Sequence, residues 1–258
     1  MNIKSYNKED YDWWKNSAVN SAKQIVPFIL ECLPIKSVLD FGCAQGGWLS
    51  VFHEHGIKNI KGLDGEWVNT EDLLVPLESF HCVDLEKYQH LPTEKYDLCI
   101  CLEVAEHLEF KHSDALIANL TNASDIILFS AAVPGQGGQH HVNERPPSFW
   151  QKKFENNGFE QFDFLRDRYW RNDSVAWWYK QNIMIYSKVN LRPKLKVLCN
   201  DFYGKHVIHP TAFSEKCSEL SINNISMRNL IKEIFKRNKN HQISGKKLNK
   251  DDFKVHNC

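Results

Sequence analysis

The stretch SVLDFGCAQGGW, residues 37–48, constrains the fold of this chain more than any other feature. Its first five residues are mostly apolar, which predicts a buried strand over 37–41. Gly42, Gly46 and Gly47 follow at once and let the backbone turn tightly and approach a ligand closely. A helix beginning near Gly47 would direct free peptide N–H groups and a partial positive charge at this turn. The pattern therefore predicts a strand, a ligand-binding turn and a helix in succession.

The same alternation continues for about 150 residues. Apolar runs bounded by turn residues predict strands at 37–41, 60–64, 80–85, 96–103, 125–132, 160–166 and 181–187. Helical spacing and end signals predict helices at 47–56, 112–123 and 146–159, and an earlier helix that Pro27 interrupts. Strand–helix alternation of this kind predicts an α/β fold with an open, mostly parallel sheet and helices on both faces.

The overall charge argues against two classes of partner. The 32 basic residues balance the 32 acidic ones, so no general attraction to nucleic acid or to an anionic membrane is expected. No apolar run approaches the roughly 20 residues of a membrane span, and the polar start lacks the apolar segment of a signal peptide. The eight cysteines include no C-x-x-C pair, which favours buried free thiols. We therefore expect a cytoplasmic protein with no nucleic-acid partner, no integral membrane segment and no structural zinc.

Two ligand classes suit the turn after the first strand, dinucleotides and S-adenosylmethionine. A dinucleotide fingerprint has the spacing G-x-G-x-x-G, but Ala44 stands two residues after Gly42. Asp40 lies within the strand end, before the first glycine. The resulting D-x-G-x-x-x-G arrangement favours a ligand without a pyrophosphate.

Acidic residues end the next three predicted strands. Asp64 ends the second and is suited to the two ribose hydroxyls. Asp84, with the backbone of Leu85 beside it, ends the third and is suited to an adenine amino group. Glu103 ends the fourth, and Glu106 and His107 follow it at the expected mouth of the site. Three acids at three successive strand ends indicate one binding site rather than unrelated surface charges.

At these residues the chain resembles the class I S-adenosylmethionine-dependent methyltransferases. The motifs that carry the resemblance are VLDFGCAQGGW, GLDG, VDL and YDLCICLEVAEHLE, over about residues 37–110. Ala44 departs from the family, which usually has glycine there. The resemblance implies a Rossmann-like seven-stranded sheet and S-adenosylmethionine as cofactor. The implied cofactor-binding residues are Asp40, Gly42, Cys43, Ala44, Gly46, Trp48, Asp64, Gly65, Asp84, Leu85 and Glu103.

A narrower resemblance covers residues 128–186. FSAAVPGQGGQHHVNERPPSFWQKKFENNGF and YWRNDSVAWWYKQNIMIY look like a subgroup of methyltransferases from bacterial polysaccharide and glycan biosynthesis. This similarity implies O-methylation of a sugar hydroxyl, on a nucleotide-linked sugar or a growing glycan, in capsular or surface polysaccharide biosynthesis. Two alternatives stay open: methylation of another small molecule or a lipid-linked acceptor, and a non-catalytic S-adenosylmethionine-binding module that supports a partner. Homo-oligomerisation is left open as well.

A sugar hydroxyl has a very high pKa, so methyl transfer to it needs a base or a metal. The glycine-rich loop GQGGQHHVNER offers His141 as general base, with His140 beside it and His107 as the competing base. A metal is weakly signalled, because His140, His141 and Glu144 lie in a glycine-rich loop and not on a helix, where i, i+4 spacing would preform a ligand pair. Asn143 and Glu144 are suited to hold a sugar hydroxyl or to order the loop. The remaining expected substrate-binding residues, which supply a cation or an aromatic face, are Arg145, Trp170, Arg171 and Trp178.

Three segments are expected. Residues 1–36 form an aromatic and helical segment that either closes over the site as a lid or packs on the sheet edge. Residues 37–190 form the cofactor-binding methyltransferase domain. Residues 191–258 form an extension with a short helix at 227–238 and a basic end that is solvated or attaches to a partner.

Overall fold

The computed structural model describes residues 8–87, 94–188 and 207–219. One compact unit spans Met1–Ala212 and a second spans Phe213–Cys258, so the expected segments 1–36 and 37–190 lie within one unit. The short helix expected at 227–238 and the basic end lie outside the described residues. No helix in the described ranges is both long and apolar enough to cross a membrane.

Seven strands form a single mixed sheet in the order β3-β2-β1-β4-β5-β7-β6. Only β7 runs antiparallel to its neighbours, β5 and β6. The predicted seven-stranded, mostly parallel sheet is therefore confirmed. The strands are β1 (Ser37–Phe41), β2 (Asn59–Asp64), β3 (Phe80–Cys82), β4 (Leu98–Leu102), β5 (Ile126–Ser130), β6 (Phe159–Phe162) and β7 (Met184–Lys188).

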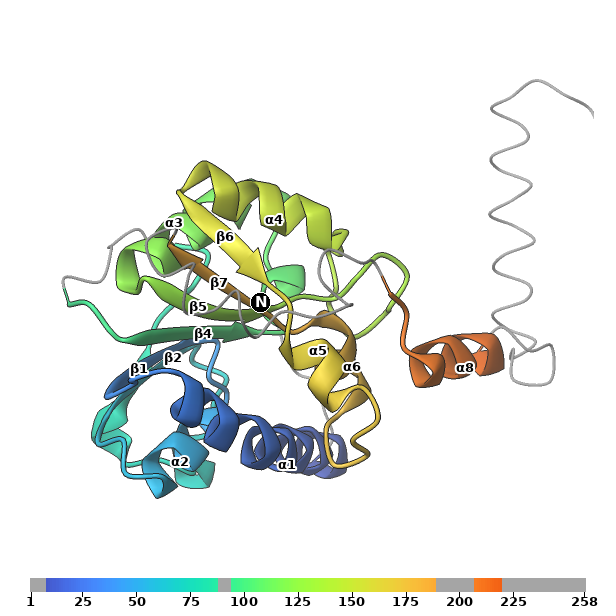
Figure 1. Ribbon diagram of the computed structural model, residues 1–258. Helices are drawn as coiled ribbons and strands as arrows, with labels where there is room; N and C mark the ends of the chain where they lie inside the picture. The colour runs from blue at the N-terminus through green and yellow to red at the C-terminus, as the bar shows by residue number, and fades with distance from the viewer. Residues whose placement is uncertain (1–7, 88–93, 189–206, 220–258) are drawn as a thin grey trace, which may run out of the picture. The chain divides into compact units, whose positions relative to one another are not determined.

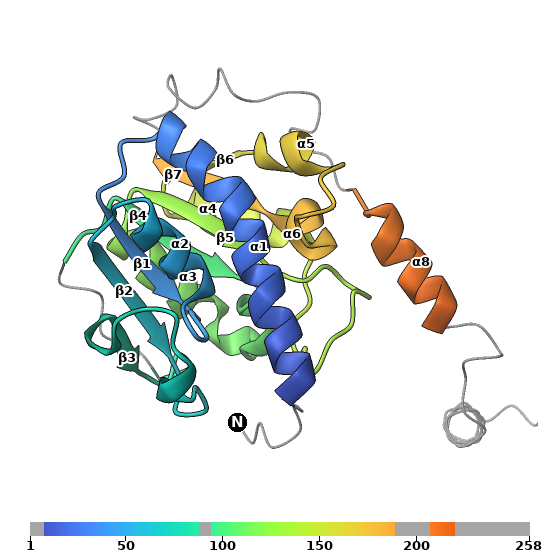
Figure 2. The ribbon, with the colours of Figure 1, turned by 90° about the horizontal axis from the view of Figure 1, so that it is seen from below.

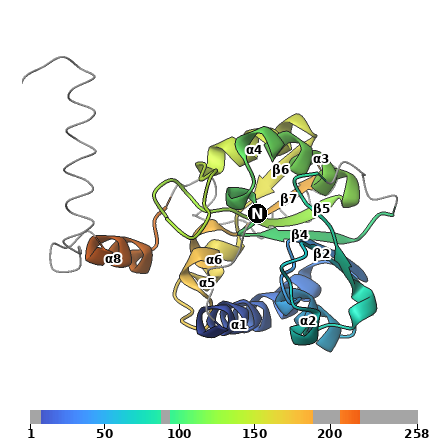
Figure 3. The same ribbon diagram turned by 180° about the vertical axis from the view of Figure 1, so that it is seen from behind.

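Helices cover both faces of the sheet (Figures 1 and 3). In both views α3 and α4 lie on one face, with α1 and α2 on the other. The helices are α1 (Lys8–Cys32), α2 (Gly47–Glu54), α3 (Ser113–Ala123), α4 (Pro147–Asn156), α5 (Leu165–Tyr169), α6 (Trp177–Asn182) and α8 (Pro210–Glu219), with short 3₁₀ turns at Thr70–Asp72, Leu77–Ser79, Ala105–His107 and Phe110–His112.

Two apolar cores follow from the two-residue period of the strands. Along β4, Leu98 and Ile100 join the core under α1 and α2, whereas Cys99 and Cys101 join the core under α3 and α4. All five residues of β1, β4 and β5 are buried. Strands covered on both faces read as continuous apolar runs, which is why these three were readable from the sequence.

The expected interruption at Pro27 is wrong, because α1 continues through it. Proline removes one backbone donor and crowds the preceding turn. Here Ile25, Val26 and Ile29 are fully buried against the sheet, and this packing offsets the local loss. Figure 2 shows α1 running across one face of the sheet. The described part of α1 thus packs on a face of the sheet and not on its edge, and the lid role considered for the N-terminal aromatic residues stays a prediction.

Other differences lie in the third strand, which ends at residue 82 instead of 85, and near the last strands. Residues 181–182 end α6 instead of starting β7, and residues 165–166 begin α5 instead of ending β6. Short amphipathic stretches of this kind are ambiguous between helix and strand by periodicity alone. The consequence for the site is that α6 delivers Asn182 to the edge where β4 ends.

Candidate active site

The glycine turn after β1 lies where the connections change direction in the sheet. From β1 the chain moves outward to β2 and β3, and it then returns to β4 on the other side of β1. Ligands of open α/β sheets bind at this switch point, beyond the carboxyl ends of the strands. The turns after β1 and β4 touch here, because a Cβ on Gly42 would meet Val104 at 2.3 Å.

The backbone is strained at three points around this edge. Ala44, Glu103 and His140 are the non-glycine residues with positive φ in the described part of the chain, and they follow β1, β4 and β5. Left-handed backbone costs an L-residue about 1–2 kcal/mol, and such strain gathers at functional sites. The φ of +47° at Ala44 explains why glycine is usual in similar turns. Alanine is tolerated at the cost of this strain.

Asp64 holds the glycine turn in place. Its carboxylate accepts hydrogen bonds from the peptide N–H groups of Ala44 and Gly65, each at 2.7 Å. Burial raises the pKa of Asp64, and these two bonds partly offset the effect. The carboxylate has about four lone-pair positions, so these bonds leave it able to accept a ligand hydroxyl as well.

Asp40 is buried close to Asp64. Burial raises the pKa of Asp40 well above its usual range, and the charge of Asp64 adds to this. The two carboxylates beside a strained turn favour a ligand that carries positive charge.

Cys43 and Trp48 are also buried. A Cβ on Gly62 would meet Cys43 Sγ at 2.5 Å, and the ring centroids of Trp48 and Tyr179 lie 5.3 Å apart, edge to face. Cys43 thus acts as a packing residue in the floor of the turn.

Asp84 differs from the other acids at the strand ends. It is exposed and pairs with Lys87 at 2.7 Å, which lowers its pKa. Leu85 is half-buried against the core under α3 and α4. The expected contact of these two residues with adenine stays a prediction.

Glu103 is held by side chains that the sequence reasoning missed. Its carboxylate accepts hydrogen bonds from Gln136 at 3.0 Å and from Asn182 at 3.2 and 3.3 Å. Burial raises the pKa of Glu103, and its hydrogen bonds offset part of the rise. Gln136 lies in the glycine-rich loop that the sequence did single out. Asn182 was hidden because its segment was assigned to a strand.

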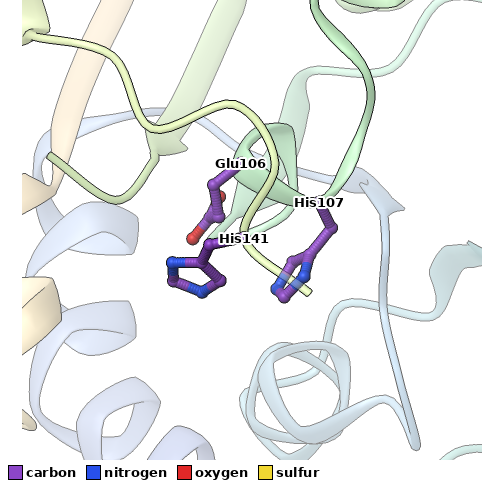
Figure 4. Close-up of side chains that lie close together, drawn as sticks. All are labelled: Glu106, His107 and His141. Atoms are coloured by element: carbon purple, nitrogen blue, oxygen red, sulfur yellow. The ribbon is translucent and has the colours of Figure 1, made fainter. Parts of the chain in front are cut away.

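Histidines and acids meet above this edge (Figure 4). The rings of His107 and His141 lie 4.9 Å apart, edge to face. His141 Nδ1 lies 2.9 Å from Glu144 Oε1. The peptide N–H groups of Val142 and Asn143 donate to the carbonyl of Glu106, which pins the two loops together. The loop after β5 therefore stands directly over the turn after β4, as its glycine content suggested.

Glu144 orders that loop by accepting hydrogen bonds from several of its residues. It accepts the peptide N–H of Gly135 at 2.7 Å and of Gly137 at 2.6 Å. Burial alone would raise the pKa of Glu144, but the hydrogen bonds from His141 and the two glycines lower it. An ionised Glu144 keeps the proton of His141 on Nδ1, which leaves Nε2 as the acceptor.

Asn143 and Arg145 bond and pack on residues other than the histidines. Asn143 is buried and donates to Ser113 Oγ at 3.1 Å, and Arg145 Nε donates to Asn143 Oδ1 at 2.8 Å. The guanidinium of Arg145 also lies over the rings of Phe110 and Phe149. Of the two roles considered for Asn143, these contacts match the ordering of the loop.

The remaining predicted residues are divided between two places. Trp178 packs on Trp13 of α1 at 5.4 Å and on Tyr179, which reaches Trp48 at the glycine turn. Trp170 instead packs on His209 at 4.7 Å, and Arg171 beside it is exposed. His140 is exposed, and its backbone bonds the ring of His107.

Comparison with known proteins agrees with this geometry. A family model described as a methyltransferase domain matches residues 20–182, more than half of the chain. No curated protein sequence matches significantly.

Among solved structures, DesVI of Streptomyces venezuelae is 12% identical, with a TM-score of 0.52 over 72% of this chain and 100% of that chain. Magnesium protoporphyrin IX methyltransferase (ChlM) of Synechocystis PCC 6803, with bound SAM, is 19% identical, with a TM-score of 0.49 over 67% and 80%. A candidate O-methyltransferase of Nostoc punctiforme PCC 73102 is 14% identical, with a TM-score of 0.48, and this chain spans 56% of its length. At such identities the likeness to DesVI shows the fold alone.

The family match covers the glycine turn, the acids at the strand ends and the histidine loop. The buried acids Asp40 and Asp64 beside the turn fit a cationic sulfonium ligand rather than a pyrophosphate. The chain therefore belongs to the S-adenosylmethionine-dependent methyltransferase domain family.

Proposed function

We propose that the protein transfers a methyl group from S-adenosylmethionine to a sugar hydroxyl, on a nucleotide-linked sugar or a growing glycan, in the making of capsular or surface polysaccharide. The observation that carries the proposal is the 2.9 Å contact between His141 Nδ1 and Glu144 Oε1. It supplies an oriented proton acceptor at the carboxyl edge of the sheet, beside the turn after β4. Transfer to a hydroxyl requires such a group, because the acceptor must lose its proton as the bond forms.

The cofactor supplies an electrophilic methyl group when it is bound. We assign the glycine turn, with Gly42, Ala44 and Gly46, to hold it closely. Asp64 would accept the ribose hydroxyls, and the positive charge of the sulfonium would offset the burial that raises the pKa of Asp40. Glu103, whose carboxylate is held by Gln136 and Asn182, follows β4 at the same edge.

His141 is assigned to promote loss of the acceptor's proton, in the simplest form as a general base. Its side chain is 12% exposed, so solvent competes little for the ring, and Glu144 stabilises the charge that the ring gains. His107 is the second candidate. Burial and the neighbouring His141 lower the pKa of His107 to about 4, so that it is a much weaker base than an ordinary histidine.

The acceptor side rests on exposed aromatic rings. Trp13 is 55% exposed. Its ring contacts Trp178, which contacts Tyr179, and Tyr179 in turn contacts Trp48 at the glycine turn. Sugar C–H faces pack well on such rings. The exposed Arg171 lies next to Trp170 in the sequence and would pair with a carrier phosphate.

A mass-spectrometric screen tests the proposal. The protein is incubated with methyl-labelled S-adenosylmethionine and a panel of nucleotide-sugars, glycan fragments, small phenols and lipid-linked sugars. We expect a gain of one methyl mass on a sugar hydroxyl, reduced at least 100-fold in His141→Gln and unchanged in His81→Gln, which alters an exposed histidine on β3.

Other outcomes would count against the proposal. Labelling of only a non-sugar acceptor would overturn the substrate class. Cofactor binding by calorimetry with no product from any acceptor would favour a non-catalytic binding module. Full activity of His141→Gln would show that His141 does not promote loss of the acceptor's proton. Loss of activity in His107→Gln alone would assign that role to His107.

A further inference from the structure

Three side chains from two loops converge at the mouth of the site. Glu106 and His107 belong to the 3₁₀ turn after β4, and His141 belongs to the loop after β5. One ligand-type atom of each lies within 4.8 Å of the other two. Figure 4 shows the carboxylate of Glu106 directed at the ring of His141, with the ring of His107 beside it.

The carboxylate of Glu106 is buried without adequate compensation. The residue is 0% exposed, and neither oxygen accepts a well-formed hydrogen bond from the described residues. Burial and the nearby Glu103 raise the pKa of Glu106, and the peptide N–H groups of Glu106 and Ala132 offset this only in part. A buried carboxylate normally has hydrogen-bond donors or a cation as partner.

Both histidines already use one ring nitrogen outside the cluster. Nδ1 of His141 bonds Glu144, and one nitrogen of His107 bonds the backbone of His140. Metal-ligating histidines characteristically donate their second N–H to a carboxylate or a backbone carbonyl. Each ring therefore keeps a second nitrogen outside these two bonds, available to ligate an ion.

We propose that Glu106, His107 and His141 bind one divalent transition-metal ion, of the Zn²⁺ or Co²⁺ type. Two imidazoles and one carboxylate suit these ions better than Mg²⁺ or Ca²⁺, which prefer oxygen ligands. Ligand atoms around tetrahedral zinc lie roughly 3.3 Å apart, given bonds of about 2.0–2.2 Å. The ligand atoms, which lie within 4.8 Å of one another, thus need to close by up to about 1.5 Å. The weak metal signal in the sequence concerned His140, His141 and Glu144, of which only His141 is a ligand in this proposal.

The ion would sit beside the acceptor, and this role rests on the proposed function. Three protein ligands leave an open position for the acceptor hydroxyl. A bound cation lowers the pKa of such a hydroxyl, so its proton passes to solvent while the oxygen keeps the bonding pair. That oxygen forms the bond to the methyl carbon as the carbon–sulfur bond breaks, with its pair returning to sulfur. His141 then acts as a ligand held by Glu144, and not as the base itself.

Cobalt binding to the full chain, without cofactor or acceptor, tests the site directly. Co²⁺ is titrated and followed by visible absorption and calorimetry, because its spectrum separates imidazole and carboxylate ligation from thiolate ligation. We expect one equivalent to bind without thiolate bands, in wild type and in the matched control His81→Gln. The affinity should fall at least tenfold in Glu106→Gln and His141→Gln, and 10–100-fold in Glu144→Gln, which alters the outer partner.

Circular dichroism of each variant shows whether it is folded, so that a loss of affinity is not confused with unfolding. His141 lies in a loop and belongs to neither apolar core, so we expect His141→Gln to fold. Equal Co²⁺ affinity in wild type and Glu106→Gln would overturn the proposal, as would no binding by wild type. The result is separable from the proposed function. Sugar methylation that survives chelation in a protein that binds no Co²⁺ would reject the metal site alone, and Co²⁺ binding without sugar methylation would reject the substrate alone.

Discussion

The carboxylate of Asp64, at the end of β2, lies 2.7 Å from the peptide nitrogen of Ala44, in the turn after β1. One acid therefore orders the neighbouring strand's turn, in addition to the ribose contact assigned to it. Ala44 has a φ of +47°, so the bond holds a strained residue in place. The glycine turn is thus ordered by an acid that the sequence marked for a different reason.

We expect Asp64→Asn to weaken S-adenosylmethionine binding by tenfold or more. The amide has a single acceptor oxygen, so it cannot serve both Ala44 and Gly65 as well as a ribose hydroxyl. Calorimetry measures the affinity, with Asp84→Asn as the comparison because Asp84 is exposed. A larger loss in Asp84→Asn than in Asp64→Asn would reverse this ranking of the two acids.

Gly138→Ala should disable His141 without unfolding the protein. A Cβ at this position would lie 2.3 Å from His141 Nε2, so the ring must move. We expect at least a tenfold loss of methyl transfer with unchanged cofactor affinity. Gly158→Ala is the control, because it also has positive φ but no atom within 4 Å of the added Cβ. Equal activity in the two variants would show that the observed ring position is not needed.

Asp163 and Arg166 form an ion pair whose side chains are 0% and 1% exposed. Burial raises the pKa of Asp163 even though Arg166 opposes this. Arg166→Met leaves a buried acid without its partner, which should lower the free energy of unfolding by about 3–5 kcal/mol. Denaturant titration measures this loss. The double variant with Asp163→Asn should recover much of it, and failure to do so would mean that Arg166 acts mainly through its other contacts.

Asp125 should contribute to stability in a pH-dependent way. Burial raises its pKa, but hydrogen bonds from Lys188 at 2.8 Å and Lys95 at 3.2 Å outweigh this and lower the pKa overall. A lowered folded-state pKa stabilises the fold above the unfolded value of about 4, and the effect disappears as pH falls through the folded value.

The comparison of wild type with Asp125→Asn checks this sign. The carboxylate is 45% exposed, so the difference at pH 7 should stay below about 1 kcal/mol. It should shrink towards zero near pH 3, as measured by urea unfolding at several pH values. A difference that grows as the pH falls would contradict the assignment.

Trp13→Ala should affect the acceptor and not the cofactor. The ring is 55% exposed and contacts Trp178, so its loss removes a packing face without opening the core. We expect the KM for the sugar acceptor to rise about 5–10-fold, in line with the roughly 1 kcal/mol of an aromatic contact, with little change in kcat. An unchanged KM would place the acceptor elsewhere.

Local sequence patterns determined the sheet and the cofactor turn. β1, β4 and β5 are covered on both faces and so appear as continuous apolar runs, and the glycines after β1 mark a turn that needs positive φ. An acid at a strand end must lie at the carboxyl edge once the strands are parallel. Asp40, Asp64 and Glu103 could therefore be placed at this edge without coordinates.

Tertiary structure alone decided which side chains meet. The helix α1 continues past Pro27 because it packs on the sheet. The helix α6 places Asn182 within hydrogen-bond distance of Glu103. Glu106 and His141 are 35 positions apart in the sequence, so no spacing rule could pair them. Side-chain periodicity reports only which face of its own element a residue occupies, whereas contact between two loops depends on how the strands before them are ordered in the sheet.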